Sequence, residues 1–334
     1  MPVNTMRQEL GLLFSVIIPT YRRRDALRNS LQSLSTQTLD RRCFEVVVVN
    51  NFPEIGVNDI INEYSSLINI ISLDEPKVGA HQARNLGSKF ANGRYLVFLD
   101  DDCEAHPSLL ERYRSAIELY RPVIAGGSID IKWDNAPPSW VRPFEFLMGK
   151  IDFGKACFWL REGQSVCGGN LLIRRDFFNK IGGMEPDQVG KIILGSGDVA
   201  LSLSANRHGH KVLWVGDAKV WHHQRRCVNA RLRDLMRREF NNGIMTAYEF
   251  KKKVHRSSKL GLVPLSIRLL VTSINQFFRG ALGFNKCALV SSCLALSTLI
   301  GLHWFYFYKS RIVPYPELSS LNSATVTKSD LTAS

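Results

Sequence analysis

Residues 95–107 read Y-L-V-F-L-D-D-D-C-E-A-H-P, and their chemistry changes abruptly after the fifth residue. The first five residues are apolar, as in a strand that is buried on both faces. Asp100, Asp101 and Asp102 follow directly, so three carboxylates lie where this strand ends. Ionised carboxylates this close raise one another's pKa unless a cation lies among them, and oxygen ligands suit Mg²⁺ or Mn²⁺. The stretch therefore indicates a divalent metal site, with an acidic turn before the next helix as the alternative.

The chain around this stretch alternates between strand-like and helix-like runs. We expect strands at 14–18, 44–49, 68–73 and 95–99, and helices at 25–35, 58–65 and 79–90. Such alternation with short connections predicts an α/β fold, with a mostly parallel, Rossmann-like central sheet flanked by helices. Ligands of such folds bind at the carboxyl ends of the strands, where the three carboxylates lie.

Composition limits the class of protein. A chain of 334 residues with 45% hydrophobic content can bury one large α/β domain and an appendage. Its cysteines are odd in number and form no C-x-x-C pair, which favours a reducing compartment: Cys43, Cys103, Cys157, Cys167, Cys227, Cys287 and Cys293. The first apolar run, at 11–18, is short and stops at Pro19, so no cleavable signal is predicted.

Positive charge is concentrated in one segment. The net charge is +13, and residues 207–259 hold 14 Lys or Arg against 4 Asp or Glu, a local net charge of +10. This basic segment predicts an anionic ligand. A nucleic-acid-binding protein would account for the basic segment, but it would not account for carboxylates at a strand end.

Several motifs, taken in order, resemble glycosyltransferase family 2, whose fold is called GT-A. The first half contributes I-I-P-T-Y, V-V-V-V-N-N, A-R-N-L-G and F-L-D-D-D, and the second half G-G-N-L-L-I-R-R, G-S-G-D-V-A-L, H-G-H-K-V and V-W-H-H. The resemblance covers about 14–238. It implies an inverting transferase that moves a sugar from a nucleotide diphosphate sugar with the help of Mg²⁺ or Mn²⁺.

The resemblance also implies roles for individual residues. The donor site would be formed by Pro19, Thr20, Tyr21, Asn50, Arg84, Asp100 and Asp101. Asp102 would bind the metal directly, and a histidine of V-W-H-H would complete the metal shell. A strand is expected at 211–215 and a turn at 220–221 before the histidines. His222 is the first choice as ligand, and His223 stays open.

Two positions depart from the family pattern near the donor. The family more often has Asp where this chain has Asn50. An amide both accepts and donates, which suits the edge of uracil or thymine, so UDP or dTDP is favoured over GDP. Cys103 stands where many relatives continue the acids, and it is interpreted as a small buried residue.

The second half supplies the expected acceptor side. By resemblance Asp198, at the start of a helix, is the general base; a helix cap is the alternative. Relatives usually carry Glu before this Asp, whereas this chain carries Gly197. The acceptor site is assigned to Gly169, Asn170 and Trp140, although Trp140 lies in an irregular aromatic segment whose rings could equally pack under the loop.

The last third changes to apolar composition. Residues 287–308 carry no formal charge and end in H-W-F-Y-F-Y, which predicts a membrane-spanning or membrane-inserted helix. Residues 263–284 read as an interfacial amphipathic helix, with a buried helical pair as the alternative. The expected segments are an extension at 1–13, a nucleotide-sugar half at 14–127, an acceptor half at 128–238, a basic linker at 239–262, membrane-associated helices at 263–308 and a disordered tail at 309–334.

The predicted function is transfer of a single sugar, because the Q-x-x-R-W signature of processive synthases is absent. The partners would be a nucleotide diphosphate sugar, a carbohydrate or lipid-linked acceptor and a membrane surface, with no nucleic acid. The catalytic domain would be cytoplasmic and serve polysaccharide or glycolipid assembly. The alternatives are a nucleotidyl or phosphoryl transferase and a non-catalytic membrane scaffold derived from a transferase.

Overall fold

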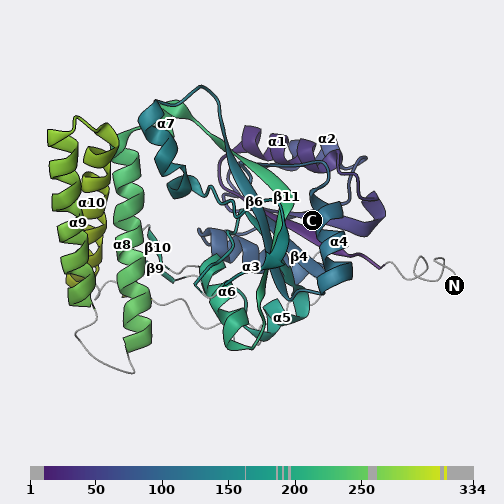
Figure 1. Cartoon of the computed structure of the whole chain (residues 1–334). Coiled ribbons are helices and arrows are strands. Elements are labelled where there is room, and N and C mark those ends of the chain that lie inside the picture. Colours follow the sequence, from purple (N-terminus) through teal and green to yellow (C-terminus); the bar gives the residue numbers. More distant parts are fainter. Residues whose placement is uncertain are drawn as a thin grey trace.

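The computed structural model describes residues 11–161, 163–185, 187–189, 192–194, 197–254, 262–308 and 312–313. An α/β domain is built on one large sheet, and three long helices stand together at one side of it (Figure 1). The sheet order is β3-β2-β1-β4-β8-β6-β11-β5, with β7 also paired to β11. A small second sheet has the order β10-β9-β12.

The first half of the large sheet is parallel, as expected. Its strands are β1 (Phe14–Thr20), β2 (Phe44–Asn50), β3 (Ile70–Asp74) and β4 (Tyr95–Leu99). They are joined through α1 (Arg24–Ser35), η1 (Arg41–Cys43), α2 (Asn58–Tyr64) and α3 (Ala80–Phe90). Every residue of β1, β2 and β4 is buried, which is why apolar residues dominate these strands. The register pairs Thr20 with Asn50, so both residues lie at the carboxyl edge.

Helices cover both faces of the sheet. On one face, α1, α2 and α4 (Leu109–Tyr120) pack on the side chains of Phe14, Val16 and Ile18. On the other face, α3, α5 (Arg175–Lys180) and α6 (Gly197–Arg207) pack on residues such as Ile17 and Val47. The alternation of neighbouring β1 residues between the two clusters follows from the two-residue period of a strand.

The second half of the sheet is mixed in direction. It contains β5 (Cys103–Ala105), β6 (Ile124–Trp133), β7 (Cys157–Trp159), β8 (Asn170–Arg174) and β11 (Val212–Gln224). β8 runs antiparallel to both β4 and β6, and β11 runs parallel to β6 and antiparallel to β5. The boundary expected after residue 127 falls inside β6, because both halves share this one sheet.

Strand β11 corrects one expectation. The predicted turn at 220–221 is wrong: the strand continues to Gln224, and its pairing with β6 shifts between Val215 and Val220. A bulge of this kind bends a strand without ending it. The bulge lies against Gly127, where an added Cβ would come within 1.8 Å of the Ala218 carbonyl oxygen.

The remaining elements connect the sheet to a helical arm. They are η2 (Ser139–Met148), α7 (Arg226–Asn229), β9 (Asp187–Val189), β10 (Ile192–Leu194) and β12 (Ile312–Val313). The arm consists of α8 (Leu232–Val254), α9 (Leu262–Leu282) and α10 (Lys286–Tyr308). The expected boundary at residue 239 lies within α8.

Helix α10 packs closely against α8. A Cβ on Gly243 would lie 2.1 Å from the Thr298 carbonyl oxygen, and a Cβ on Gly301 would lie 2.0 Å from that of Phe240. Glycine at both positions lets the two backbones touch, as small residues do at helix crossings. The apolar helix expected at 287–308 is therefore present, but it is partly enclosed: of its candidate membrane span Lys286–Phe305, 44% is buried.

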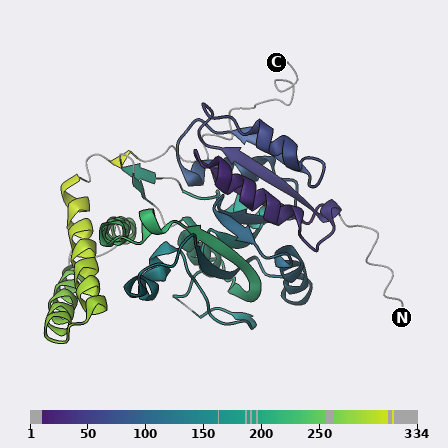
Figure 2. The same cartoon turned by 90° about the horizontal axis from the view of Figure 1, so that it is seen from above.

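Helix α9, unlike the partly enclosed α10, exposes many large hydrophobic side chains. Its exposed large hydrophobic residues include Ile267, Ile274, Phe277 and Phe278. Arg268 and Arg279 are exposed as well. On the side facing α10, Ser273 Oγ donates to the Ser292 carbonyl oxygen at 3.1 Å. Helix α10 thus lies between α9 and α8 (Figure 1), and Figure 2 shows the same arm from above, beside the α/β domain.

Candidate active site

The site lies at the carboxyl edge of the parallel strands. Thr20 ends β1, Asn50 ends β2, and Asp100 follows β4. A cleft of about 900 Å³ opens beside them. It is lined by Asp100, Asp102, Cys103, His222, His223 and Gln224, by five arginines at 22, 23, 24, 225 and 238, and by further residues of α1 and α7.

Asp101 lies beneath the turn and holds it in place. Its side chain is fully buried and accepts a hydrogen bond from Thr20 Oγ1 at 2.8 Å. Arg23 Nη2 lies 2.8 Å from the other carboxylate oxygen as an ion pair without hydrogen-bond geometry. Burial raises the pKa of Asp101 to about 7, against the opposing charge of Arg23. Asp101 therefore fixes Thr20 and Arg23 instead of facing the cleft.

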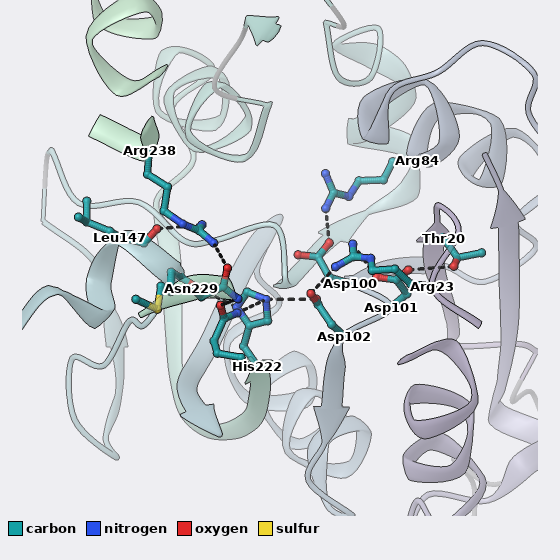
Figure 3. A network of polar contacts seen from close by, with 12 residues as sticks. Thr20, Arg23, Arg84, Asp100, Asp101, Asp102, Leu147, His222, Asn229 and Arg238 are labelled. Carbon is teal, nitrogen blue, oxygen red and sulfur yellow. Dashed lines mark hydrogen bonds and ion pairs between the residues drawn. The ribbon is translucent and has the colours of Figure 1, made fainter. Parts of the chain in front are cut away.

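Asp102 faces His222. Asp102 Oδ1 lies 3.1 Å from His222 Nε2, because β5 pairs with β11 in the register that sets Cys103 opposite His222. His223 points elsewhere and contacts Glu104 Oε2 at 2.8 Å. Burial alone would raise the pKa of Asp102, but the hydrogen bond and charge of His222, with the charge of Arg23, lower it. Of the two histidines, His222 is thus the one beside the acids (Figure 3).

The geometry around His222 fits a divalent cation. Its Nδ1 lies 2.7 Å from the Met148 carbonyl oxygen, so Nδ1 carries the hydrogen and donates it. In the neutral ring Nε2 then carries a lone pair, and its neighbours are Asp102 Oδ1 at 3.1 Å and Gln224 Nε2 at 3.0 Å. The two acceptors His222 Nε2 and Asp102 Oδ1 need a proton or a cation between them. Two neighbouring ligands about 2.1 Å from one octahedral ion are separated by about 3 Å. The pair therefore suits Mg²⁺ or Mn²⁺.

Cys103 lies beside this pair, and its sulfur is within 4.8 Å of the ligand atoms of Asp102 and His222. Burial raises the pKa of Cys103 well above its ordinary value, so it stays a protonated thiol. A soft thiol is also a poor ligand for the hard ions that carboxylates select. The structure thus agrees with Cys103 as a small buried residue.

Arg23 is a site residue that the sequence did not single out. It contacts both Asp101 and Asp102 from the start of α1. Burial would lower the pKa of Arg23, but the charges of the three acids raise it. Its position three residues after Thr20, at the same edge as the acids, was the available signal.

Arg84 and Asp100 form a second ion pair, with Arg84 Nη2 2.5 Å from Asp100 Oδ1. Arg84 is buried on α3, so its guanidinium is held in place. The turn before β8 lies directly on this pair. A Cβ on Gly169 would be 3.2 Å from Asp100 Oδ2, and one on Gly168 would be 3.6 Å from Arg84 Nη2. Segments from the two halves of the chain therefore meet here.

Asp198 reaches the same place from the start of α6. Its Oδ2 accepts from the Gly168 amide at 2.8 Å, and its Oδ1 accepts from the Val199 amide at 2.8 Å. Asp198 thus caps a helix and also holds the turn beside Arg84 and Asp100. Residues 195–196 of the expected glycine turn lie outside the described residues.

A contact between α3 and α6 accounts for the glycine before Asp198. A Cβ on Gly197 would lie 2.4 Å from His81 Nε2, so the imidazole of His81 occupies the space of a side chain. His81 Nδ1 lies 3.3 Å from the Glu185 carbonyl oxygen. Burial, and then the charge of Arg84, lowers the pKa of His81 to about 4, so the ring is neutral. The sequence did not indicate this contact.

The expected nucleoside residues lie together at the end of β1 and β2. Pro19 is buried, whereas Tyr21 is exposed and packs edge-on against Phe52, with ring centroids 5.3 Å apart. Asn50 is buried and bonds within its own loop: its Nδ2 donates to the Ile55 carbonyl oxygen at 3.2 Å, and its Oδ1 accepts from the Phe52 amide at 3.2 Å. The amide orientation of Asn50 is therefore fixed by the loop.

Two residues expected at the acceptor lie away from the cleft. Asn170 is completely buried; it accepts from Tyr113 Oη at 2.6 Å and donates to the carbonyl oxygens of Ser128 at 3.1 Å and Ala218 at 2.8 Å. Its side chain holds β8 to the bulge of β11 and is not available to an acceptor. Trp140 packs in the apolar cluster that η2 forms with α8 and α10. Of the three, only Gly169 lies beside the acids.

Comparisons with known proteins identify the family. The model of glycosyl transferase family 2 matches residues 15–182, about half of the chain. The glycosyltransferase AglE of Haloferax volcanii is 26% identical over 205 residues, which are 61% of this chain and 64% of that protein. The uncharacterized glycosyltransferase YibD of Escherichia coli is 34% identical over 98 residues, 29% of this chain and 28% of its own. The chain thus spans less than two thirds of these relatives.

Solved structures show the same fold. S. aureus TarS in complex with UDP-GlcNAc aligns with a TM-score of 0.51 at 15% identity, over 88% of this chain and 92% of that one. The mannosyltransferase PcManGT of Pyrobaculum calidifontis, in complex with GDP-Man and Mn²⁺, aligns with a TM-score of 0.53 at 13% identity, over 93% and 78%. The chain belongs to glycosyl transferase family 2 and has the GT-A fold.

Proposed function

We propose that this enzyme transfers one sugar, with inversion, from a nucleotide diphosphate sugar to an acceptor hydroxyl. The observation that carries the proposal is the meeting of Asp102 with His222, and of Arg84 and Asp100 with Asp198, at the carboxyl edge of the sheet. A cation site, a buried arginine and a carboxylate near a helix start are what a diphosphate donor and an acceptor hydroxyl require.

The donor is UDP- or dTDP-linked in this proposal. Thr20, Tyr21 and Asn50 lie at adjoining strand ends, where the nucleoside binds, and Arg84 supports the diphosphate. Asn50 retains one amide hydrogen and one lone pair beyond its loop bonds, which suits the accepting and donating edge of uracil or thymine. One of the two solved neighbours is in complex with UDP-GlcNAc and the other with GDP-Man, so the argument for the nucleobase rests on Asn50 alone.

Mg²⁺ or Mn²⁺ is held by Asp102 and His222 in this proposal. When bound, the ion supplies positive charge to the diphosphate that leaves the sugar. The Met148 carbonyl keeps the His222 ring in the tautomer that presents Nε2. Asp101 and Arg23 hold the turn that presents Asp102.

The transfer step uses Asp198 as the base. The acceptor hydroxyl gives its proton to the Asp198 carboxylate while its oxygen bonds to the anomeric carbon on the face opposite the diphosphate. The bond between that carbon and the diphosphate oxygen breaks, and its electron pair leaves with the nucleotide. Attack from the opposite face inverts the anomeric configuration. The backbone of Gly169, beside Asp100, is the acceptor contact that we retain.

The membrane is the proposed location, with the catalytic domain on the cytoplasmic side and the product in a polysaccharide or glycolipid. The exposed hydrophobic side chains of α9 provide the surface that enters a bilayer interface. Phe277 and Phe278 are central to it. The full chain should float with lipid vesicles in a density gradient, and the double variant Phe277→Glu/Phe278→Glu should stay at the bottom. If both proteins stay at the bottom, the membrane location is wrong.

A donor panel tests the reaction itself. Purified full-length protein with Mn²⁺ and a set of nucleotide sugars should slowly release nucleoside diphosphate from a UDP- or dTDP-sugar. Transfer to an acceptor, followed by NMR, should give the anomer opposite to that of the donor. Preference for a GDP-sugar would overturn the argument from Asn50. Binding of nucleotide and metal without any turnover would support the scaffold alternative instead.

A further inference from the structure

Helix α8 places one arginine of the basic segment in the cleft. Arg238 lines the same cleft as Asp100, Asp102 and His222, and its guanidinium points toward them from the arm (Figure 3). Arg237, the preceding residue, is exposed on the outside of the helix and lies 4.0 Å from Asp234. The two neighbouring arginines of α8 therefore have different surroundings.

The contacts of Arg238 are weak for a half-buried cation. Its Nη1 donates to the Leu147 carbonyl oxygen at 3.3 Å, and its Nη2 lies 3.5 Å from Asn229 Oδ1. Its Nε is buried and has no hydrogen-bond partner. Within the described part of the chain, no carboxylate comes within 4 Å of Arg238, whereas Arg23 and Arg84 each pair with an acid of the site.

The electrostatics of Arg238 favour an added anion. Burial, and then the charge of Arg237, lowers the pKa of Arg238, and the charges of Asp102 and Asp234 offset this only in part. A phosphate can accept two parallel hydrogen bonds from a guanidinium, which is the strongest pairing available to such a group.

We propose that Arg238 binds the diphosphate of the donor, on the side of the metal site opposite the nucleoside. This inference rests on the proposed function. Thr20, at the nucleoside end, and Arg238 lie on opposite sides of the Asp102–His222 pair (Figure 3). A donor that extends from Thr20 past Asp102 therefore presents its phosphates between these two ends. Arg84 and Arg238 would then approach the diphosphate from α3 and from the arm.

A chain of hydrogen bonds links Arg238 to the metal site. Asn229 Nδ2 donates to Gln224 Oε1 at 2.7 Å, and Gln224 Nε2 lies 3.0 Å from His222 Nε2. Asn229 Oδ1 in turn lies 3.5 Å from Arg238 Nη2. The guanidinium is therefore oriented by the same network that orients His222, which places it for a ligand of Asp102 and His222 (Figure 3).

The test compares the binding of UDP and of uridine to the full-length protein with Mn²⁺, by calorimetry. Arg238→Ala should weaken UDP binding about 10- to 100-fold, the loss of one to two charge-assisted hydrogen bonds. Uridine has no phosphate, so its affinity should change less than about twofold. Arg238→Lys keeps the charge but not the paired donors, so its affinity for UDP should lie between those of Arg238→Ala and the wild type. Arg237→Ala is the matched control and should bind UDP like the wild type.

Each outcome decides the inference. If the wild type binds no nucleoside diphosphate, the proposed function fails and this inference fails with it. If the wild type binds UDP and Arg238→Ala binds it equally well, only this inference is wrong. Equal weakening for UDP and uridine would make Arg238 a structural tie between α8 and η2. Should Arg238→Ala unfold, Arg238→Gln, which keeps most of the side chain, carries the same comparison.

Discussion

The two halves of the large sheet build the active site in different ways. In the parallel half Thr20 ends β1, Asn50 ends β2 and Asp100 follows β4. Because these strands run the same way, the three residues meet at one edge. In the mixed half the contributions come from a turn, from the start of a helix and from the far end of a bent strand. Strand order alone therefore assembles the first set, whereas the second set depends on pairing between distant segments.

The halves also differ in how their charges are compensated. Each acid after β4 has an arginine partner: Asp100 pairs with Arg84, and Asp101 and Asp102 pair with Arg23. On the side of the arm, Arg238 has only weak neutral contacts. The parallel half is therefore organised before ligand binds, and the arm presents positive charge that a ligand can compensate. If this division holds, variants in the two halves should affect binding and turnover differently.

The largest effect is expected for Asp102→Ala, which removes the carboxylate beside His222. Transfer should fall below detection because the leaving diphosphate loses its charge compensation. The fold should persist, because Asp101, not Asp102, makes the buried contact with Thr20. Activity and metal binding can be measured with Mn²⁺ and with EDTA, and thermal melting checks the fold.

Asp217→Ala is the matched control for that experiment. Asp217 is an exposed carboxylate on the same strand as His222, at the bulge, and its removal should leave transfer unchanged. Full wild-type activity in EDTA would show that transfer needs no metal. The pairing of Asp102, after β4, with His222 of β11 would then have no part in the reaction.

The next effect is expected for Asp198→Asn, which separates turnover from binding. Loss of the base should lower transfer about 10²- to 10⁴-fold, while the affinities for nucleotide and metal stay near wild type. One amide hydrogen bond of the pair at Gly168 and Val199 would be lost as well, so stability should fall by about 1 kcal/mol. Steady-state kinetics, nucleotide titration and thermal melting measure the three quantities.

A parallel loss of donor affinity and activity would contradict this division. Asp198 would then act as a helix cap or donor contact, and the turn at Gly168 would be its main site of action. The base would have to be sought among other acids near the acceptor side. If Asp198→Asn transferred sugar normally, Asp198 would likewise not be the general base.

The sequence predicted the parallel half closely, for a physical reason. A buried strand is a continuous apolar run, so β1, β2 and β4 were located within a few residues. The sequence does not determine whether His222 or His223 lies beside Asp102. Neighbours in a strand face opposite ways, and the register with β5 decides which histidine faces Asp102. Arg23 was missed because one arginine among three in a row carries no local pattern.

The arm illustrates the same limit in the second half. Helix α10 is apolar on all sides, and a core helix has that composition just as a membrane span does. The structure places α10 against α8, and most of the exposed large hydrophobic side chains of these helices belong to α9. Asn170 is a similar case: its motif suggested a ligand contact, but its amide is used by β6, β11 and Tyr113 of α4.

The smallest effect on transfer is expected for Gly197→Ala, which tests a contact between the two halves of the sheet domain. His81 belongs to α3 and Gly197 to α6, and a Cβ on Gly197 would lie 2.4 Å from the imidazole. Gly197→Ala should therefore destabilise the fold by about 1 to 3 kcal/mol and raise the acceptor KM, because the start of α6 must shift. His81→Ala opens the space that the new methyl group needs. The double variant should recover about 0.5 to 3 kcal/mol relative to the sum of the single effects.

Thermal melting of the four proteins closes this cycle, with acceptor KM as the second measurement. Gly56→Ala is the control, since a Cβ there meets open space and should change stability by less than about 0.5 kcal/mol. Additive effects of Gly197→Ala and His81→Ala would mean that α6 begins elsewhere and that the two halves do not touch at this point. Coupling with an unchanged acceptor KM would keep the contact but make it purely structural. Coupling in both measurements would show that the buried imidazole on α3 fixes where Asp198 stands.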